Sequence, residues 1–298
     1  MNKAAIHALQ PAVDDAGRLA SHLGLPLHVI DVHRFPDGEL RVTIGAATET
    51  AIVYAPLDQP NDKLLALLFA AEAFRREGVA RLLLVAPYLC YMRQDIAFRK
   101  GEAISQKVVG ALIANSFDRV VTVDAHLHRT KNIEDVFPHI EAQDLSAMAA
   151  IADALRGEGI NGATVIVGPD EESRPWISDL AGRLGLMHAA ARKSRRGDRS
   201  VGIVFPEPGL FAGRPALIVD DIVSSGGTLI ACAKALLSAG ANTVDAVIIH
   251  ALFPPEMMQS FLNAGIRSVR STTSVTHPSN SFRLDRLLAD AVRKEKGR

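Results

Sequence analysis

Two adjacent carboxylates followed by small residues form the most informative segment of the chain. An apolar stretch at residues 216–219 leads into Asp220 and Asp221, and Ser224, Ser225, Gly226, Gly227 and Thr228 then precede a helical pattern. Backbone N–H groups and hydroxyls at the start of a helix can hold a phosphate. The acids would repel a phosphate but can accept hydrogen bonds from nearby sugar hydroxyls, so a pentose phosphate satisfies both parts of the loop. The plainer interpretation is a strand end followed by helix-capping serines.

Four further segments place polar side chains beside apolar strand candidates, at residues 34–41, 87–95, 123–126 and 167–170. Each has an ordinary explanation when taken alone. They could be a Pro-Asp-Gly turn, a solvated loop with buried aromatic residues, a structural histidine and a capping aspartate. Ligands in open α/β sheets, however, bind at the carboxyl ends of the strands. A shared ligand site is therefore the competing interpretation.

In this order and spacing, the five segments resemble the ribose-phosphate diphosphokinase family, also called phosphoribosyl pyrophosphate synthetases. The resemblance runs from about Phe35 to His250 and covers most of the chain. Phosphoribosyltransferases lack the Phe-x-Asp-Gly-Glu pattern at 35–39 and the Arg-Gln-Asp pattern at 93–95. The resemblance implies a fold of two similar phosphoribosyltransferase-type domains, each a mostly parallel sheet flanked by helices.

The resemblance also assigns a role to each matched residue. The residues implied to bind ATP are Phe35, Asp37 and Glu39, which in the family reach across a subunit boundary, and Arg93, Gln94 and Asp95 of the same subunit. The residues implied to bind ribose 5-phosphate are Arg195, Asp220, Asp221, Ser224, Ser225, Gly226, Gly227 and Thr228. Lys193 and Arg195 would form the catalytic pair, and His126 and Asp170 would be the protein groups associated with Mg²⁺.

The implied reaction transfers the diphosphoryl group of ATP to the C1 hydroxyl of ribose 5-phosphate, giving phosphoribosyl pyrophosphate and AMP. Such a transferase, or kinase, of nucleotide biosynthesis works mostly by positioning and charge stabilisation. Mg²⁺ is often held through substrate phosphates, which suits a site with one Asp and one His. The alternatives are a phosphoribosyltransferase and a non-catalytic nucleotide-binding regulatory subunit. ATP, ribose 5-phosphate and further copies of the chain are the expected partners.

The chain departs from the usual family pattern at several positions. Ser224 stands where an Asp is common, and Glu171-Glu172-Ser173 follows Asp170 where a Gly-Gly pair is usual. Residues 96–98, Ile-Ala-Phe, replace a more basic stretch after Asp95, and Cys90 and Met92 replace small residues before it.

Short apolar runs alternate with helical patterns along the chain. The runs predict strands at 27–32, 40–44, 51–55, 81–86, 119–124, 164–168, 216–219 and 243–249. Apolar residues at helical spacing predict helices at 60–76, 104–116 and 227–239. This alternation indicates an α/β fold with a mostly parallel sheet. Pro138 and the polar stretch 141–144 favour a boundary between an ATP-side domain, 1–142, and a domain for ribose 5-phosphate, 143–298.

Composition restricts the class of protein. The chain has 298 residues with 33 basic and 33 acidic side chains, so the net charge is zero, which argues against a wholly basic nucleic-acid-binding protein. The apolar runs fall well short of the ~20 residues that span a bilayer. Two cysteines, Cys90 and Cys232, make no disulfide framework and favour a reducing, cytoplasmic location. From the charge and the short apolar runs we expect no nucleic-acid or membrane partner.

Overall fold

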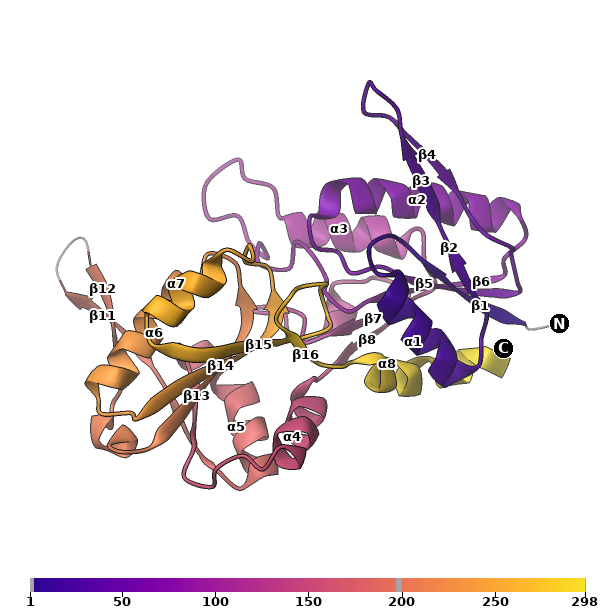
Figure 1. Cartoon of the computed structure of the whole chain (residues 1–298). Coiled ribbons are helices and arrows are strands. Elements are labelled where there is room, and N and C mark those ends of the chain that lie inside the picture. The colour runs from indigo at the N-terminus through magenta and orange to yellow at the C-terminus, as the bar shows by residue number, and fades with distance from the viewer. Residues whose placement is uncertain (1–2, 197–199, 298) are drawn as a thin grey trace. The chain divides into compact units, whose positions relative to one another are not determined.

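The chain forms two compact units, each built around its own sheet (Figure 1). The computed structural model describes residues 3–196 and 200–297, with the backbone alone for 193–196, 200–202 and 297. The first unit comprises Met1–Leu145, Ser274–Thr276 and Leu284–Arg298, and the second comprises Ser146–Thr273 and His277–Arg283. Residues 284–298 thus return to the first unit, whereas the sequence placed them in the second half.

The first unit contains a six-stranded parallel sheet in the order β2-β1-β5-β6-β7-β8. Its central strands are buried on both faces, which suits their runs of Val, Ile, Leu and Ala. The strands are β1 (Ala4–Ala8), β2 (Leu27–Val29), β5 (Thr50–Tyr54), β6 (Arg81–Ala86), β7 (Arg119–Val123) and β8 (Glu141–Leu145). The helices are α1 (Val13–Leu23), α2 (Pro60–Arg76), α3 (Ser105–Ala114), η1 (Ile133–Asp135), α8 (Asp285–Val292) and η4 (Arg293–Gly297).

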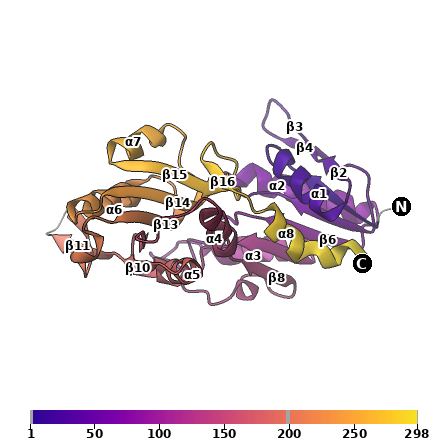
Figure 2. The same cartoon turned by 60° about the horizontal axis from the view of Figure 1, so that its bottom comes forward.

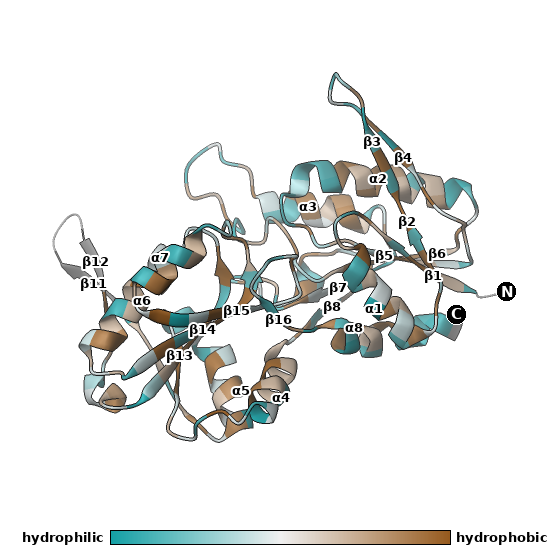
Figure 3. Ribbon diagram, in the orientation of Figure 1, coloured by the Kyte–Doolittle hydropathy of each residue, from teal (hydrophilic) through white to brown (hydrophobic). Residues whose placement is uncertain are grey.

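Helix α2 illustrates how the sequence specifies these elements. Pro60 occupies the start of the helix, where its missing N–H costs nothing, and Leu64, Leu67 and Ala71 are buried at helical spacing. Arg75 and Arg76 lie in the last turn, where basic side chains favour the helix end. Hydrophobic and hydrophilic residues alternate along the helices of both units in Figure 3.

The second unit contains a six-stranded parallel sheet in the order β10-β9-β13-β14-β15-β16. Its strands are β9 (Val165–Gly168), β10 (Met187–Ala190), β13 (Pro215–Val223), β14 (Thr243–Ala251), β15 (Ile266–Thr272) and β16 (Asn280–Phe282). Its helices are α4 (Met148–Gly157), η2 (Glu171–Ser173), α5 (Arg174–Leu184), η3 (Pro208–Phe211), α6 (Gly227–Ser238) and α7 (Met257–Asn263). None of the helices in the described part of the chain is long and apolar enough to cross a membrane.

The two sheets repeat one topology. In each, the chain lays down an inner strand, then the edge strand beside it, and then crosses to the other side for the remaining four. In each, an antiparallel hairpin is inserted at the crossing: β3 (Asp31–Arg34) with β4 (Leu40–Thr43), and β11 (Arg192–Arg196) with β12 (Ser200–Val204). The β3–β4 hairpin projects from its own unit in Figures 1 and 2. The expected pair of similar, mostly parallel domains is therefore confirmed at the level of fold.

One local expectation needs correction. The run at 27–32 is split between β2, in the sheet, and β3, in the hairpin. The polar stretch 141–144, expected to mark a boundary, forms part of β8, the edge strand that pairs with β7, and the main segment of the first unit ends directly after it at Leu145. An edge strand keeps one side open to solvent and tolerates polar residues, so its sequence carried no apolar signal.

Candidate functional site

Three acidic residues gather at one edge of the second sheet. The strand order reverses between β9 and β13, and ligands in open α/β sheets bind at such a point. Val167 of β9 pairs with Ile218 of β13, so Asp170 and Asp220 follow at the same carboxyl edge. Burial raises the pKa of Asp220 well above its usual range, and the negative charges of Asp221 and Asp170 raise it further. The structure therefore brings together Asp170, Asp220 and Asp221.

Asp220 and Asp221 lie inside β13 rather than beyond its end. The sequence ended this strand at Val219, but β13 continues to Val223, which pairs with Ala251 of β14. The N–H of Asp221 donates a 3.1 Å hydrogen bond to Oδ1 of Asp220, and the N–H of Ile222 donates a 2.7 Å bond to Oδ1 of Asp221. These bonds to local backbone groups fix the direction of both carboxylates.

A small hollow of about 80 Å³ lies between β13 and the start of α6. Its walls are formed by Asp220 and by the loop after it, namely Ser224, Ser225, Gly226, Gly227 and Thr228, together with Ile222, Val223 and Leu229. All five predicted loop residues thus face one space, beside the first turn of a 12-residue helix. The first N–H groups of such a helix favour an anion.

Gly226 is the residue that makes this loop possible. Its φ is +70°, a conformation that other residues adopt at a cost, and it immediately precedes α6. A Cβ on Gly226 would lie 2.5 Å from Cε1 of Phe261. The glycine therefore lets the loop backbone pack against α7 while the loop turns into the helix.

The departure at 171–173 builds contacts around Asp170. Ser173 is buried, its hydroxyl donates to the carbonyl of Asp170, and it fills the space where a Cβ on Gly168 would lie. Glu171 accepts hydrogen bonds from Arg174 at 2.7 Å and Arg192 at 3.0 Å, and these lower the pKa of its carboxyl. Glu171 thus ties the end of β9 to the first residue of the β11–β12 hairpin.

Lys193 and Arg195 lie on that hairpin. Their backbones pair with Ile203 and Val201 of β12. Their side chains lie outside the described residues, so the catalytic pair stays a prediction.

In the first unit, the Arg93-Gln94-Asp95 turn follows β6. Arg93 is exposed, whereas Gln94 is half-buried and its Oε1 accepts a 3.0 Å bond from the hydroxyl of Ser105. The Asp95 side chain is 1% exposed and pairs with Arg129. Burial alone would raise the pKa of Asp95, but the hydrogen bonds from Arg129 outweigh it and hold the pKa below its usual range. The buried Asp95 thus supports the turn, whereas Arg93 stays exposed.

His126 lies in the loop after β7, also in the first unit. Asp124, which starts this loop, has a positive φ of 40°. The next N–H, of Ala125, donates to both carboxylate oxygens of Asp144 in β8, at 3.1 and 3.2 Å. His126 is half-buried and His128 is exposed, and their ring centroids are 6.4 Å apart.

Phe35, Asp37 and Glu39 lie at the tip of the β3–β4 hairpin. The N–H of Phe35 donates to the carbonyl of Glu39 at 2.8 Å, and Gly38 adopts a φ of 93° to complete the turn. The Phe35 side chain is 38% exposed, and all four residues of β3 are exposed. These three residues therefore lie at an open hairpin tip and are not part of a core.

Three of these contacts involve residues that the sequence did not single out: Arg129, Asp144 and Arg192. Each is paired with a residue far along the chain, at separations of 34, 19 and 21 positions. No local pattern marks such a pair before the fold is known.

The donor set suits Mg²⁺ carried by a substrate. Asp170 supplies an oxygen ligand of the kind that Mg²⁺ prefers, and the repulsion between its charge and that of Asp220 favours a nearby cation. In the described part of the chain, no cluster of three or more His, Cys, Asp or Glu side chains could hold a metal ion by itself.

A duplicated parallel α/β fold with acids and a phosphate-type loop at its switch point defines the phosphoribosyltransferase class of fold and site. Residues 6–116 match the N-terminal domain of ribose phosphate pyrophosphokinase, and residues 140–256 match the phosphoribosyl transferase domain. The ribose-phosphate pyrophosphokinase of Methanopyrus kandleri is 30% identical over 286 residues, which cover 94% of this chain and 95% of that one. The corresponding protein of Brucella melitensis is 33% identical and covers 87% and 84%.

The crystal structure of phosphoribosylpyrophosphate synthetase from Mycobacterium smegmatis has the same fold, with a TM-score of 0.84 over 98% of both chains and 22% identity. The chain belongs to the ribose-phosphate pyrophosphokinase family, whose members are transferases. The resemblance to this family is thereby confirmed; pyrophosphokinase and diphosphokinase are two names for one activity.

Proposed function

We propose that the chain transfers the diphosphoryl group of ATP to the C1 hydroxyl of ribose 5-phosphate, giving phosphoribosyl pyrophosphate and AMP. The main support for this proposal is the hollow at Asp220 and residues 224–228, which combines a buried acid with the start of a helix. Family membership supports the same reaction and a role in nucleotide biosynthesis.

Ribose 5-phosphate would lie with its phosphate against the 224–228 loop. The N–H groups at the start of α6 and the hydroxyls of Ser224, Ser225 and Thr228 would donate to phosphate oxygens. Asp220 and Asp221 would accept hydrogen bonds from the ribose hydroxyls. This arrangement would leave the C1 hydroxyl free of the loop, as the proposed transfer requires.

ATP would be held by Arg93 and Gln94, with Asp95 supporting their turn. Phe35, Asp37 and Glu39 would complete the ATP site from a neighbouring copy of the chain. The exposure of the hairpin tip supports this assignment, because an isolated two-stranded hairpin is only marginally stable and gains from packing against a partner. A symmetric homo-oligomer follows from a site shared in this way.

Mg²⁺ would be associated with Asp170 and His126 and would neutralise charge on the phosphates when bound. Lys193 and Arg195 would stabilise negative charge on the transferred group and on the departing AMP. Such donors act by positioning and electrostatics, the main terms in phosphoryl transfer.

We also propose a reducing, cytoplasmic location. Both cysteines, Cys90 and Cys232, are buried and free. Burial raises the pKa of the Cys90 thiol to about 12, which makes it a poor nucleophile. These thiols therefore serve packing, as expected for a protein with no need of disulfides.

The test is to incubate the purified protein with ATP, Mg²⁺ and ribose 5-phosphate and to measure the products. AMP and phosphoribosyl pyrophosphate in equal amounts support the proposal. A regulatory subunit would bind the nucleotide without forming AMP, and a phosphoribosyltransferase would consume phosphoribosyl pyrophosphate when given a nucleobase.

A further inference from the structure

Two loops of the first unit lie side by side at the carboxyl ends of adjacent strands. One, residues 93–104, follows β6 and carries the Arg93-Gln94-Asp95 turn; the other, residues 124–131, follows β7 and carries His126. Ala86 of β6 pairs with Thr122 of β7, so the two loops leave the same edge of the sheet. Residues 93–104 form no helix or strand, so contacts from neighbouring residues must hold them.

Arg129 makes the principal contacts between these loops. Its guanidinium Nη1 donates to Oδ1 of Asp95 at 2.9 Å, and its backbone N–H donates to Oδ2 at 2.9 Å. Its guanidinium carbon also lies 5.7 Å from the ring centroid of Phe98. One residue of the His126 loop thus holds both carboxylate oxygens of Asp95 and one face of Phe98.

The two side chains differ in burial, and this difference determines the cost of losing the ion pair. The Asp95 side chain is 1% exposed, whereas that of Arg129 is 43% exposed. Removal of the guanidinium would leave a buried carboxylate without its charged partner, a change that costs far more than the loss of a surface ion pair. The loop with Asp95 would then have to open to hydrate the carboxylate.

The contact with Phe98 falls on a departure from the family pattern. Residues 96–98 are Ile-Ala-Phe, where a more basic stretch is usual, and Phe98 is 60% exposed. A cation over an aromatic ring is attracted by the ring's electrons. Arg129 therefore supplies the positive charge beside this stretch from the neighbouring loop.

We propose that Arg129 is a positioning residue that joins the 93–98 segment to the His126 loop, so that the ATP-binding turn is ordered before ATP arrives. The identity of the ligand rests on the proposed function, but the tether itself does not. An ordered turn lowers the entropy lost on binding, which appears as tighter ATP binding. Loss of the tether should weaken ATP binding while leaving ribose 5-phosphate, bound in the second unit, little affected.

The experiment compares Arg129→Met, Arg129→Lys and the control Arg75→Met. Met keeps the length of the stem without charge, and Lys keeps a charge without the fork of donors. Arg75 also forms an Arg–Asp pair in the first unit, with Asp118 at 2.8 Å, but at the amino end of the sheet. Arg129→Met should raise the KM for ATP about tenfold or more, with the KM for ribose 5-phosphate within about threefold. Arg129→Lys should give a KM for ATP between those of Arg129→Met and the unaltered chain. Arg75→Met should leave both KM values as they are in the unaltered chain.

Amide hydrogen exchange supplies a readout that needs no activity. Arg129→Met should accelerate exchange in segments 93–100 and 124–131, and Arg75→Met should not. Unchanged exchange would overturn the tether, and faster exchange with an unchanged KM for ATP would overturn its positioning role. If Arg129→Met fails to fold, Arg129→Lys decides by the same criteria. If the unaltered chain forms no AMP, the proposed function is refuted. Amide hydrogen exchange in Arg129→Met still tests the tether in that case.

Discussion

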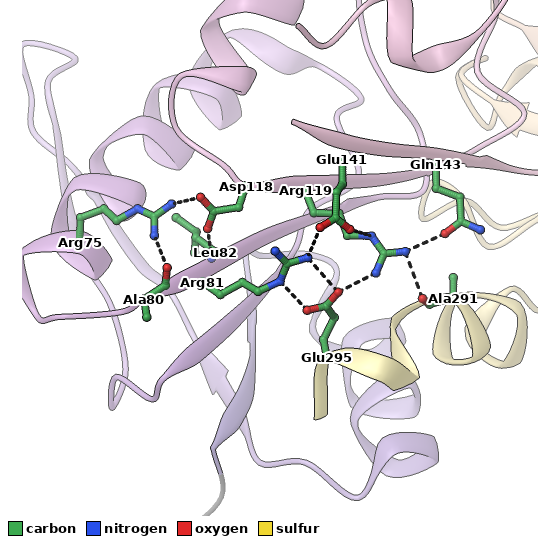
Figure 4. Close-up of polar contacts among 10 residues, drawn as sticks. All are labelled: Arg75, Ala80, Arg81, Leu82, Asp118, Arg119, Glu141, Gln143, Ala291 and Glu295. Carbon is green, nitrogen blue, oxygen red and sulfur yellow. Dashed lines mark hydrogen bonds and ion pairs between the residues drawn. The ribbon is translucent and has the colours of Figure 1, made fainter. Parts of the chain in front are cut away.

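Arg81 and Glu295 lie 214 positions apart in the sequence and form two hydrogen bonds in the first unit (Figure 4). Nε of Arg81 donates to Oε2 at 2.6 Å, and Nη2 donates to Oε1 at 3.0 Å. Arg119 donates to the same carboxylate at 2.8 Å, and the Glu295 side chain is 1% exposed. Burial would raise the pKa of Glu295, but the hydrogen bonds from both arginines outweigh it and lower the pKa. The C-terminal segment is thereby anchored to the starts of β6 and β7.

Glu295→Gln should therefore destabilise the first unit by about 2–4 kcal/mol, because two arginines lose their shared charged partner. Urea unfolding followed by circular dichroism should show an earlier transition. Trp176 in α5, the chain's single tryptophan, reports on the second unit, so its fluorescence transition should move less. The control is Glu49→Gln, whose side chain is 54% exposed and pairs with Lys3 at 3.7 Å. Equal effects of the two substitutions would contradict the anchoring role of Glu295.

The C-terminal segment, residues 284–298, shows why part of the fold could not be predicted from the sequence. Helix α2 was predicted with its observed bounds, because Pro60 marks its start and its apolar spacing marks its face. Helix α8 was not predicted, and its return to the first unit depends on pairs such as His22 with Asp285, whose partners are 263 positions apart. Ion pairs across the chain leave no periodic signal in either segment.

His7 should make the first unit sensitive to acid. This side chain in β1 is fully buried, and burial together with the nearby His28 lowers its pKa to about 4. A histidine with a lowered pKa favours the folded state at neutral pH, and this advantage is lost as the pH falls from 6.5 toward 4. A shift of this size corresponds to about 3 kcal/mol.

His7→Leu should therefore flatten the fall in stability between pH 6.5 and 4, measured as the urea midpoint at each pH. The exposed His188 of β10 provides the control, His188→Leu. An unchanged pH profile in His7→Leu would show that other groups govern the acid sensitivity.

Asp220 should contribute to ribose 5-phosphate binding and lower the free energy of unfolding at neutral pH. Its raised pKa means that ionisation opposes folding, so its stability contribution is present below pH 3.8 and is lost as the pH rises. Asp220→Asn should raise the urea midpoint at pH 7 and weaken ribose 5-phosphate binding about 10–100-fold, with a smaller effect on ATP. Calorimetric titration with each substrate measures this split. Equal weakening for both substrates would assign Asp220 to the metal or the fold.

The hairpin tip should act in a neighbouring copy of the chain. A chain with Phe35→Ala and Glu39→Ala and a chain with Lys193→Ala should each be inactive and should recover part of the activity after subunit exchange. Some mixed sites would combine an intact tip with an intact Lys193. Exchange demonstrated by mixed-label mass spectrometry without any recovered activity would mean that each ATP site is built within one chain.

The candidate site was only partly visible in the sequence. The loop at 224–228 could be predicted because glycine and hydroxyl residues after an apolar run are a local signal, and these residues line one hollow. The contact between Asp95 and Arg129 could not be predicted, since the two residues lie 34 positions apart. The side chains of Lys193 and Arg195 are outside the described residues, so their roles stay predictions.

The most direct test of the proposed reaction is product analysis with ribose 5-phosphate, Mg²⁺ and ATP labelled in its β-phosphate. The reaction should yield AMP, equal in amount to a pentose that carries the labelled diphosphoryl group, and no ADP. Lys193→Ala should lower the rate about 10²–10³-fold, as expected on loss of one charge-stabilising donor. Labelled ADP together with a pentose that has gained a single, unlabelled phosphoryl group would contradict diphosphoryl transfer and establish an ordinary kinase in its place.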